Sequence, residues 1–328
     1  MSKEVIMRGL DKIITSSGTE VDLNNITGGL IAVGGTESDH TDSNGQNWKV
    51  HTFTDDGDFV VSGSGLVEYV IVGGGGGGGA MHYGGGGGAG GFLTNIQAAA
   101  SGGGTTVPSD ESLDMSISSG TYAVSVGVGG AGYTGYNSFG RNGLPSSFNG
   151  VIALGGGVGL ATNSISSTEP TAHNGGSGGG SSSYSDGGSS YAPGSGTVGQ
   201  GYRGGYSQHN SNNWGAAGGG GAGDYGGNSS AGVAGNGGIG CSTIIRNTTP
   251  ETLAGGGGGG TGYFTNVSTG IGGDGGGGSG ASYNSRVAAD GAANTGGGGG
   301  GACHLNDNPA TNYCGAGGSG IVIIRYKA

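Results

Sequence analysis

The residues best able to do chemistry are a few histidines, cysteines and carboxylates that lie between runs of glycine. Cys303 and His304 are adjacent, and together with His82 or His173 they could contribute ligands to a metal site. A protein zinc site normally needs a second, regularly spaced ligand pair, which the sequence lacks. No Gly-x-Ser-x-Gly elbow lies between a strand and a helix, and His-Glu-x-x-His is absent. We therefore predict no enzymatic activity, no cofactor and no metal.

The cysteines leave two interpretations open. Cys241, Cys303 and Cys314 are an odd number, which excludes a fully paired set within the chain. Cys303 and Cys314 flank one short loop and could close it as a disulfide. Three free thiols are favoured, because most proteins folded in a reducing cytosol carry no disulfide.

Composition narrows the function further. Of 328 residues 92 are Gly, only 9% are charged, and the net charge is -11. An acidic chain with so few cations is a poor ligand for nucleic acid, so we predict no such partner. No stretch reaches the roughly 20 apolar residues that cross a bilayer, and the start lacks the apolar core of a secretory signal, so we predict no membrane insertion. Action outside a cell would then fit a component of a virion.

Short β-rich runs stand at both ends of the glycine region. The alternation in residues 48–54, followed by the turn Asp55-Asp-Gly-Asp58, predicts a β-hairpin with residues 58–61. Further strands are predicted at 66–72, 115–117, 122–126, 148–154 and 321–326. The last of these is apolar and must be buried, and the available partners lie some 250 residues earlier. The glycine region is therefore predicted to be an insertion between strands.

The glycine-rich tracts are similar in length. They occupy residues 73–79, 84–91, 127–132, 155–159, 175–180, 215–223, 235–240, 255–262, 270–280, 296–301 and 315–320. A flexible Gly/Ser linker has no reason to repeat one length, or to hold Tyr, Trp and Val between its runs. Collagen is also excluded, because the strict Gly-X-Y phase is absent and Pro is scarce.

We predict instead a lattice of polyproline II rods. Glycine backbones without Cβ atoms can lie close enough for N–H to C=O bonds between neighbouring rods. Fixing each residue costs roughly 1 to 2 kcal/mol, whereas each hydrogen bond returns roughly 0.5 to 1.5 kcal/mol, so only a bundle of many rods could persist. Such a rod has three residues per turn, and three series of substitutions have that spacing: Val233, Asn236 and Ile239; Ala222, Tyr225, Asn228, Ala231 and Ala234; and Ile271 with Asp274.

The predicted fold class is mainly irregular and β, with little or no α-helix. A bundle of glycine-rich polyproline II helices, a polyglycine II lattice, is inserted in a small β-sheet or β-sandwich. Residues 1–47 are an attachment or capping segment, and residues 48–154 are a β-rich region with the first rods. Residues 155–320 form the lattice with variable loops, and residues 321–328 return to the sheet.

Several stretches resemble the glycine-rich proteins of phage tails, in particular the distal adhesins of T-even-like phage tail fibres. The resemblance covers roughly residues 48–328 and rests on four stretches: His51-Thr-Phe-Thr, Val67-Glu-Tyr-Val-Ile-Val-Gly-Gly-Gly-Gly, Gly87-Gly-Ala-Gly-Gly-Phe and Gly317-Gly-Ser-Gly-Ile-Val-Ile-Ile-Arg-Tyr. It implies that rods pack as polyproline II helices and that variable loops bind a bacterial surface receptor, an outer-membrane protein or a polysaccharide. It also implies attachment to a tail-fibre shaft, assembly in the host cytoplasm and action outside the cell as part of the virion, with self-association left open.

The direction of the chain indicates which loops bind. Each rod fed by a strand carries the next loop away from the sheet, so residues 80–83, 133–141, 160–174 and 302–314 are expected at one distal surface. Tyrosine gives large contact area at small entropic cost, as in antibody loops. The predicted receptor-binding residues are His82, Tyr83, Tyr133, Tyr136, Phe139, His173, His304 and Tyr313. The central loops, with Tyr184, Tyr191, Tyr202, Tyr206, Trp214, Tyr263, Phe264 and Tyr283, cannot be assigned to an end in this way.

Two other non-enzymatic functions remain open. In a structural fibre or self-assembling filament subunit, the lattice would itself be the functional part, and the loops would only pack against neighbouring subunits. A flat ice-binding surface would carry regular small residues and Thr, whereas the loops of this chain are rich in Tyr.

Overall fold

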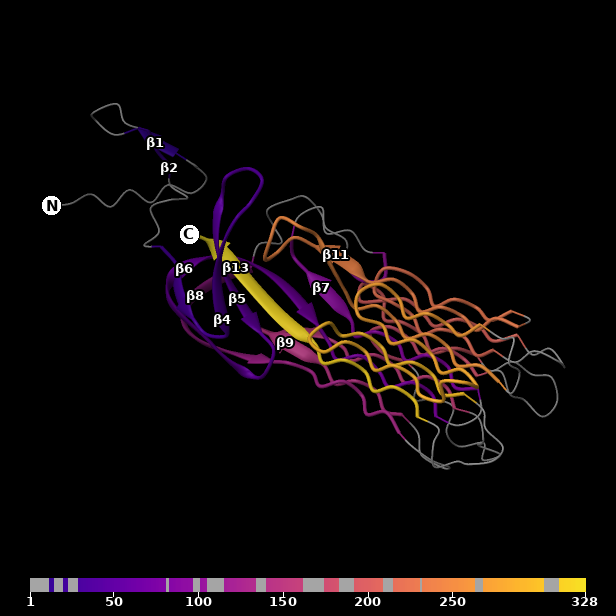
Figure 1. Cartoon of the computed structure of the whole chain (residues 1–328). Helices are drawn as coiled ribbons and strands as arrows, with labels where there is room; N and C mark the ends of the chain where they lie inside the picture. Colours follow the sequence, from indigo (N-terminus) through magenta and orange to yellow (C-terminus); the bar gives the residue numbers. More distant parts are fainter. Residues whose placement is uncertain are drawn as a thin grey trace.

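A curled β-sheet at one end and a bundle of extended chain segments make up the molecule (Figure 1). The computed structural model describes residues 12–14, 20–22, 29–80, 83–96, 101–104, 115–133, 140–161, 174–182, 192–208, 215–230, 232–262, 268–303 and 313–328. None of these residues is α-helical, as the sequence predicts. The strands are β1 (Lys12–Ile14), β2 (Glu20–Asp22), β3 (Ile31–Val33), β4 (Thr36–Thr41), β5 (Asn47–Phe53), β6 (Gly57–Val72), β7 (Phe92–Thr94), β8 (Met115–Ser125), β9 (Ser146–Phe148), β10 (Val151–Ala153), β11 (Cys241–Thr243), β12 (Glu251–Leu253) and β13 (Ile321–Lys327).

The main sheet is antiparallel and has nine strands. Its order is β10-β9-β8-β6-β13-β5-β4, and β3 and β7 pair with β6 as well. β1 pairs with β2, and β11 pairs with β12, in two separate two-stranded sheets. Because β3 and β4 belong to the main sheet, that sheet begins well before Trp48, within the segment expected to serve only for attachment or capping.

Strand β13 lies between β6 and β5, and its residues 321–326 are buried, as the apolar run predicts. It pairs with β6, where Ile321 lies opposite Val72, and with β5, where Val322 lies opposite Phe53. Val322 and Ile324 pack in a core cluster with Phe59 inside the curl of the sheet. Alternate residues of the same strand pack in a second cluster that includes Trp48, Phe92, Ile245 and Leu253. Both faces of β13 are therefore covered.

Two details of the predicted strands are wrong. Residues 48–54 and 58–61 do not pair as a hairpin, because β13 lies between β5 and β6. The stretch 148–154 is not one strand but the second half of the hairpin β9–β10, which turns at Asn149 (φ 44°) and Gly150 (φ 82°). Asn-Gly with positive φ at both residues is the turn that matches the twist of a two-residue hairpin.

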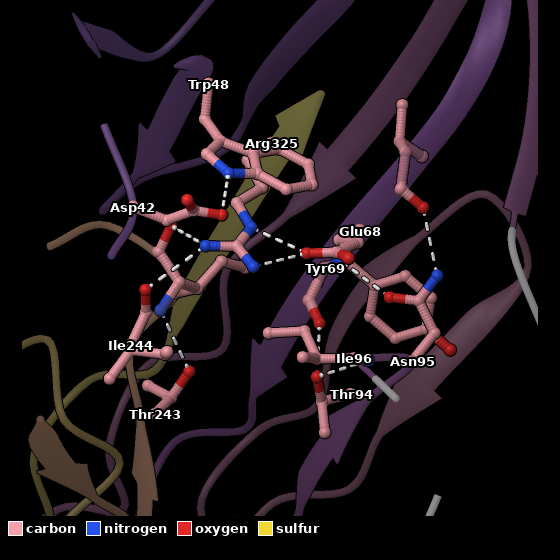
Figure 2. A network of polar contacts seen from close by, with 12 residues as sticks. Asp42, Trp48, Glu68, Tyr69, Thr94, Asn95, Ile96, Thr243, Ile244 and Arg325 are labelled. Atoms are coloured by element: carbon pink, nitrogen blue, oxygen red, sulfur yellow. Dashed lines mark hydrogen bonds and ion pairs between the residues drawn. The ribbon is translucent and has the colours of Figure 1, made fainter. Parts of the chain in front are cut away.

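Arg325 ties the β11–β12 hairpin to the sheet (Figure 2). Its Nε donates to Glu68 Oε2 at 2.6 Å, and its Nη1 donates to the carbonyls of Ile244 and Ile245 at 3.2 Å. The guanidinium also lies 4.1 Å from the ring centre of Trp48. Since a buried cation is costly unless it is paired and hydrogen-bonded, this set of contacts is what allows Arg325 to be only 5% exposed.

The bundle is a lattice of rods with a strict period of three. We call an extended segment a rod when its backbone bonds to neighbours in this period, and residues 73–80 are the central rod. Its N–H groups at 73, 76 and 79 donate to rod 84–91, those at 74 and 77 to rod 140–145, and those at 75 and 78 to rod 313–320. The seven donor–acceptor distances are 2.8 to 3.0 Å. Returning to the same neighbour every third residue is the signature of the threefold polyproline II helix.

Three further rods donate to carbonyls of the central rod. Gly130 donates to Gly75, Gly156 to Gly74 and Gly299 to Gly76, at 2.8 to 2.9 Å. The central rod is therefore enclosed by rods on all sides, and residues 73–80 are buried throughout. Its hydrogen bonds all run between rods, so no rod of this kind is stable alone.

Close packing explains why these positions are glycine. A Cβ on Gly75 would lie 2.0 Å from the carbonyl oxygen of Gly297, and one on Gly78 would lie 1.9 Å from that of Gly300. The Cα hydrogens point at neighbouring carbonyls in this arrangement, as the proposed Cα–H to O contacts require.

Residues facing outward also follow the period of three. Val233, Asn236 and Ile239 are exposed along one rod, and so are Ile271 and Asp274 along another, as predicted. The series from Ala222 to Ala234 is wrong as a single rod, because the chain turns twice within it: Ala222 ends one rod, Tyr225 and Asn228 lie on the next, and Ala234 lies on a third.

Side chains close the outer faces of the lattice. At the edge, the N–H of an outer rod has no neighbouring carbonyl, and an Asn or Asp side chain takes that place. Asn142 accepts from Val158, Asn174 from Ser195, Asn228 from Tyr206, Asn236 from Ile271, and Asp290 from Ala316, each through Oδ1 to the backbone N at 2.7 to 2.9 Å.

Candidate functional site

The end of the lattice away from the sheet is the candidate site. We call it the far end, and the end at which β6 enters the central rod the near end. Four of the chain segments that border the predicted distal loops meet there. Gly79 donates to Gly85, Gly85 donates to Leu160 and Ala302 donates to Gly79, at 2.8 to 2.9 Å. Ala80, Ala302 and Cys314 also share an apolar cluster with Tyr133.

The expectation for loop 160–174 is wrong at its second end. Leu160 lies at the far end, where it donates to Gly180. Asn174, however, begins a rod at the near end, where Gly176 donates to Gly155 at 2.8 Å. Rods 154–161 and 174–182 therefore run in the same direction. The prediction assumed that each loop joins two rods at one end, whereas Leu160 and Asn174 lie at opposite ends of the lattice.

The central segments also end at the far end. Ser181 donates to Gly205, Ser207 donates through Oγ to Ser182, and Thr261 donates to Ala281. Ala216 donates to Gly260, which itself donates to Gly84 beside the central rod. The segments bordering residues 183–191, 209–214 and 263–267 thus lie with those of the predicted distal loops.

Comparison with known families identifies the unit that carries this site. A family model described as a glycine-rich domain matches residues 52–327. This chain belongs to the glycine-rich domain family. The match begins within β5 and ends within β13, so it includes the lattice and most of the main sheet, whereas β3 and β4 precede the matched residues. A comparison with curated proteins gives no match.

Three of the predicted receptor-binding residues of the glycine-rich domain lie in the described part of the chain. Tyr133 is partly exposed, and its hydroxyl accepts a hydrogen bond from Arg141 Nε at 3.3 Å. Tyr313 is 40% exposed, and its backbone bridges to Val287. Tyr83 is only 3% exposed, so it adds almost no contact area even though it borders the loop. The remaining predictions, His82, Tyr136, Phe139, His173 and His304, fall outside the described residues.

Sequence reasoning missed two cations at the far end of the glycine-rich domain. Arg141 and Arg286 are exposed, and neither makes an ion pair with a described residue. Arg286 has a positive φ of 59° and accepts a backbone bond from Tyr313 at 3.4 Å. The chain therefore places Tyr133, Arg141, Arg286 and Tyr313 along neighbouring rods. The sequence does not reveal that Arg286 lies beside Tyr313, because only the order of the rods brings the two together.

The three cysteines are free and buried. Burial raises the pKa of Cys241 and of Cys303 to about 11, and it also raises the pKa of Cys314. Cys314 accepts the N–H of Tyr133 at its sulfur, at 3.1 Å. Thiols with raised pKa values are poor nucleophiles at neutral pH.

The described ranges contain neither a metal-binding cluster nor a membrane-spanning helix. No three His, Cys, Asp or Glu side chains among those residues could together hold a metal ion. Nor does that part of the chain contain a helix that is long and apolar enough to cross a membrane.

Proposed function

We propose that this chain is the distal adhesin of a phage tail fibre, which binds a bacterial surface receptor through loops displayed at the far end of its polyglycine lattice. The sheet, at the opposite end, would face the fibre shaft. On this proposal the protein is assembled in the host cytoplasm and acts outside the cell as part of the virion. Its receptor is an outer-membrane protein or a polysaccharide.

The observation that carries the proposal is the convergence of rod ends at one surface. Ala80, Tyr133, Leu160, Ser182, Thr261, Ala302 and Cys314 all end rods there. A framework whose backbone N–H groups donate to neighbouring rods at successive residues holds such ends in fixed positions. Binding loops on a rigid scaffold are a common arrangement in recognition proteins.

The edges of the lattice favour an adhesin over the alternative, a filament subunit. A filament that grew by adding rods sideways would need free N–H groups at the lattice edge. Instead, the side chains of Asn236 and Asp290 accept hydrogen bonds from the edge N–H groups of Ile271 and Ala316. Sheet proteins protect their edges against uncontrolled association in a comparable way.

A binding assay separates these functions. Fluorescently labelled full-length protein is added to a panel of bacterial strains, and adsorption is measured by flow cytometry, alone and in competition with phage particles that carry this chain. We expect a monodisperse protein that adsorbs to particular strains and blocks the phage on them. The double variant Tyr133→Ala, Tyr313→Ala should weaken adsorption, whereas the control Val198→Ala, at a 91% exposed residue of the near end, should not.

Two results would contradict the proposal. Polymerisation on concentration, without adsorption to any strain of the panel, would support the filament subunit. Equal adsorption by the double variant and the control would remove Tyr133 and Tyr313 from the site.

A further inference from the structure

A stack of one arginine between two tyrosines lies on the flank of the lattice. Arg203 and Tyr206 belong to rod 200–208, and Tyr225 belongs to the neighbouring rod 224–230. The guanidinium carbon of Arg203 lies 4.8 Å from the ring centre of Tyr206 and 4.7 Å from that of Tyr225. Tyr202 meets the Tyr225 ring edge-on, with the two centres 4.6 Å apart. We call these four residues the Tyr–Arg stack.

The lattice fixes the backbone beneath the stack. Arg203 and Tyr206 are three residues apart, so a threefold rod presents both on one face. Gly226 donates to the Arg203 carbonyl at 3.1 Å, and the N–H of Tyr206 donates to Asn228 Oδ1 at 2.8 Å. A ligand that binds here would not have to order the rods first, which lowers the entropic cost of binding.

The charge of Arg203 is not compensated by an acid. Nη1 donates to the carbonyl of Gly204 at 2.8 Å, and no described carboxylate forms an ion pair with the guanidinium. The neighbouring acid, Asp224, accepts the N–H of Tyr225 at 2.7 Å. A guanidinium has five N–H donors in one plane, so most of those on Arg203 have no partner among the described residues.

This arrangement has a chemical preference. The rings of Tyr206 and Tyr225 lie over the guanidinium, so the unused donors lie at its edge, where a carboxylate or phosphate binds in a bidentate manner. Tyr206 is 44% exposed and Tyr225 is 51% exposed, so both offer ring surface beside that edge. Covering a glycine flank does not require such residues, because Val128 and Ala131 are the exposed residues on another rod.

We propose that the Tyr–Arg stack binds an acidic sugar residue, with the carboxylate or phosphate on Arg203 and the sugar ring against Tyr206 and Tyr225. The inference rests on the proposed function, because it names acidic surface polysaccharide as a class of receptor for the same adhesin. It adds a second binding position, on the flank of the lattice and separate from Tyr133 and Tyr313.

Direct titration tests this without any bacterium. Full-length protein is titrated by calorimetry with oligogalacturonate, with its fully methyl-esterified neutral form, and with a phosphorylated mannose oligosaccharide. We expect binding to at least one acidic oligosaccharide, little binding to the neutral ester, and weakening by added salt. The acidic sugar that binds identifies carboxylate or phosphate as the group recognised.

Variants assign the binding to the stack. Arg203→Ala should weaken the affinity at least tenfold, Arg203→Lys should weaken it several-fold because a point charge replaces the planar donors, and Tyr225→Ala should weaken it too. The control Lys327→Ala removes an exposed cation on the sheet, outside both binding positions, and should leave the affinity unchanged. Unchanged thermal melting of each variant shows that it is folded.

Two outcomes would overturn the inference. One is no binding of either acidic oligosaccharide. The other is binding that Arg203→Ala and Lys327→Ala reduce equally, which would indicate general attraction to charge. Neither result bears on adsorption through Tyr133 and Tyr313, so failure of this inference and failure of the proposed function can be distinguished.

Discussion

Arg325 and Glu68 form an ion pair across 257 residues of sequence, with Nε to Oε2 at 2.6 Å. The Arg325 side chain is almost fully buried, and Glu68 is largely buried beside it. The pair joins β13 to β6, and through the carbonyls of Ile244 and Ile245 it also holds the β11–β12 hairpin. The sheet and the β11–β12 hairpin are thus connected at one residue.

Replacing that arginine should destabilise the whole domain. Arg325→Met keeps the bulk of the side chain but leaves Glu68 unpaired, and we expect a loss of about 3 kcal/mol in the free energy of unfolding. Urea denaturation followed by tryptophan fluorescence measures it. The control Lys49→Met removes an exposed pair with Asp39 and should cost clearly less, because water screens an exposed pair. Equal losses for the two variants would show that the buried Arg325–Glu68 pair stabilises the fold no more than the exposed Lys49–Asp39 pair.

A single methyl group in the lattice should be enough to disrupt it. Gly75→Ala places a Cβ 2.0 Å from the carbonyl of Gly297, so the rods must separate. We expect a loss of about 3 kcal/mol or more, or no folded protein. The control Gly120→Ala in β8 meets the Tyr122 ring at an ordinary 3.6 Å and should remain folded. Thermal melting of both variants decides this, and a Gly75→Ala protein as stable as the control would contradict the packing described.

The side chains that close the lattice edge should affect association as well as stability. Asn236→Ala frees the N–H of Ile271, which costs about 1 kcal/mol and leaves an open donor beside the exposed Ile239. Sedimentation velocity should detect self-association that wild-type protein lacks. The control Asn284→Ala changes an exposed asparagine in a turn. Identical sedimentation of the two variants would mean that closing this edge does not limit association.

The buried thiols should make stability fall at alkaline pH. Burial holds the pKa of Cys241 and Cys303 at about 11, against an ordinary value of 9.0. The unfolded chain therefore loses these protons first. Their contribution is fully present below about pH 9 and is lost as the pH rises toward 11. The double variant Cys241→Ala, Cys303→Ala should show a shallower decline in melting temperature over that range.

Thiol labelling gives an independent check. Native protein at pH 8 should react slowly with a thiol reagent, and all three cysteines should react once the chain is unfolded. Rapid reaction of the native protein would contradict the burial of these side chains.

The sequence predicts the lattice well wherever glycine runs are long. Residues 73–79 must be glycine throughout, because neighbouring rods surround them, and a continuous run is easy to recognise. Rod 140–145 was missed for the complementary reason. It lies at the edge, so only Gly140 and Gly143 face inward, while Arg141 and Leu144 are exposed. A search for glycine at every third position would have found it.

The order of the strands and rods could not be read from the sequence in the same way. The alternation in residues 48–54 and the run at 58–61 predict strands but not that β13 lies between them, because that contact joins residues about 250 positions apart. At the candidate site, the positions of Tyr133 and Tyr313 followed from chain direction. The Tyr–Arg stack did not, since Tyr225 meets Arg203 only through the packing of two rods.

The central position of β13 has a consequence for how the protein is made. Residues 321–327 emerge from the ribosome after every rod, yet β5 and β6 have no common partner until that strand arrives. Premature termination would leave the apolar edges of β5 and β6 open, and the end of the glycine region would no longer be tied to the sheet. Such a shortened chain is a good substrate for cellular proteases. With this topology, the sheet can be completed only after residues 321–327 have been translated.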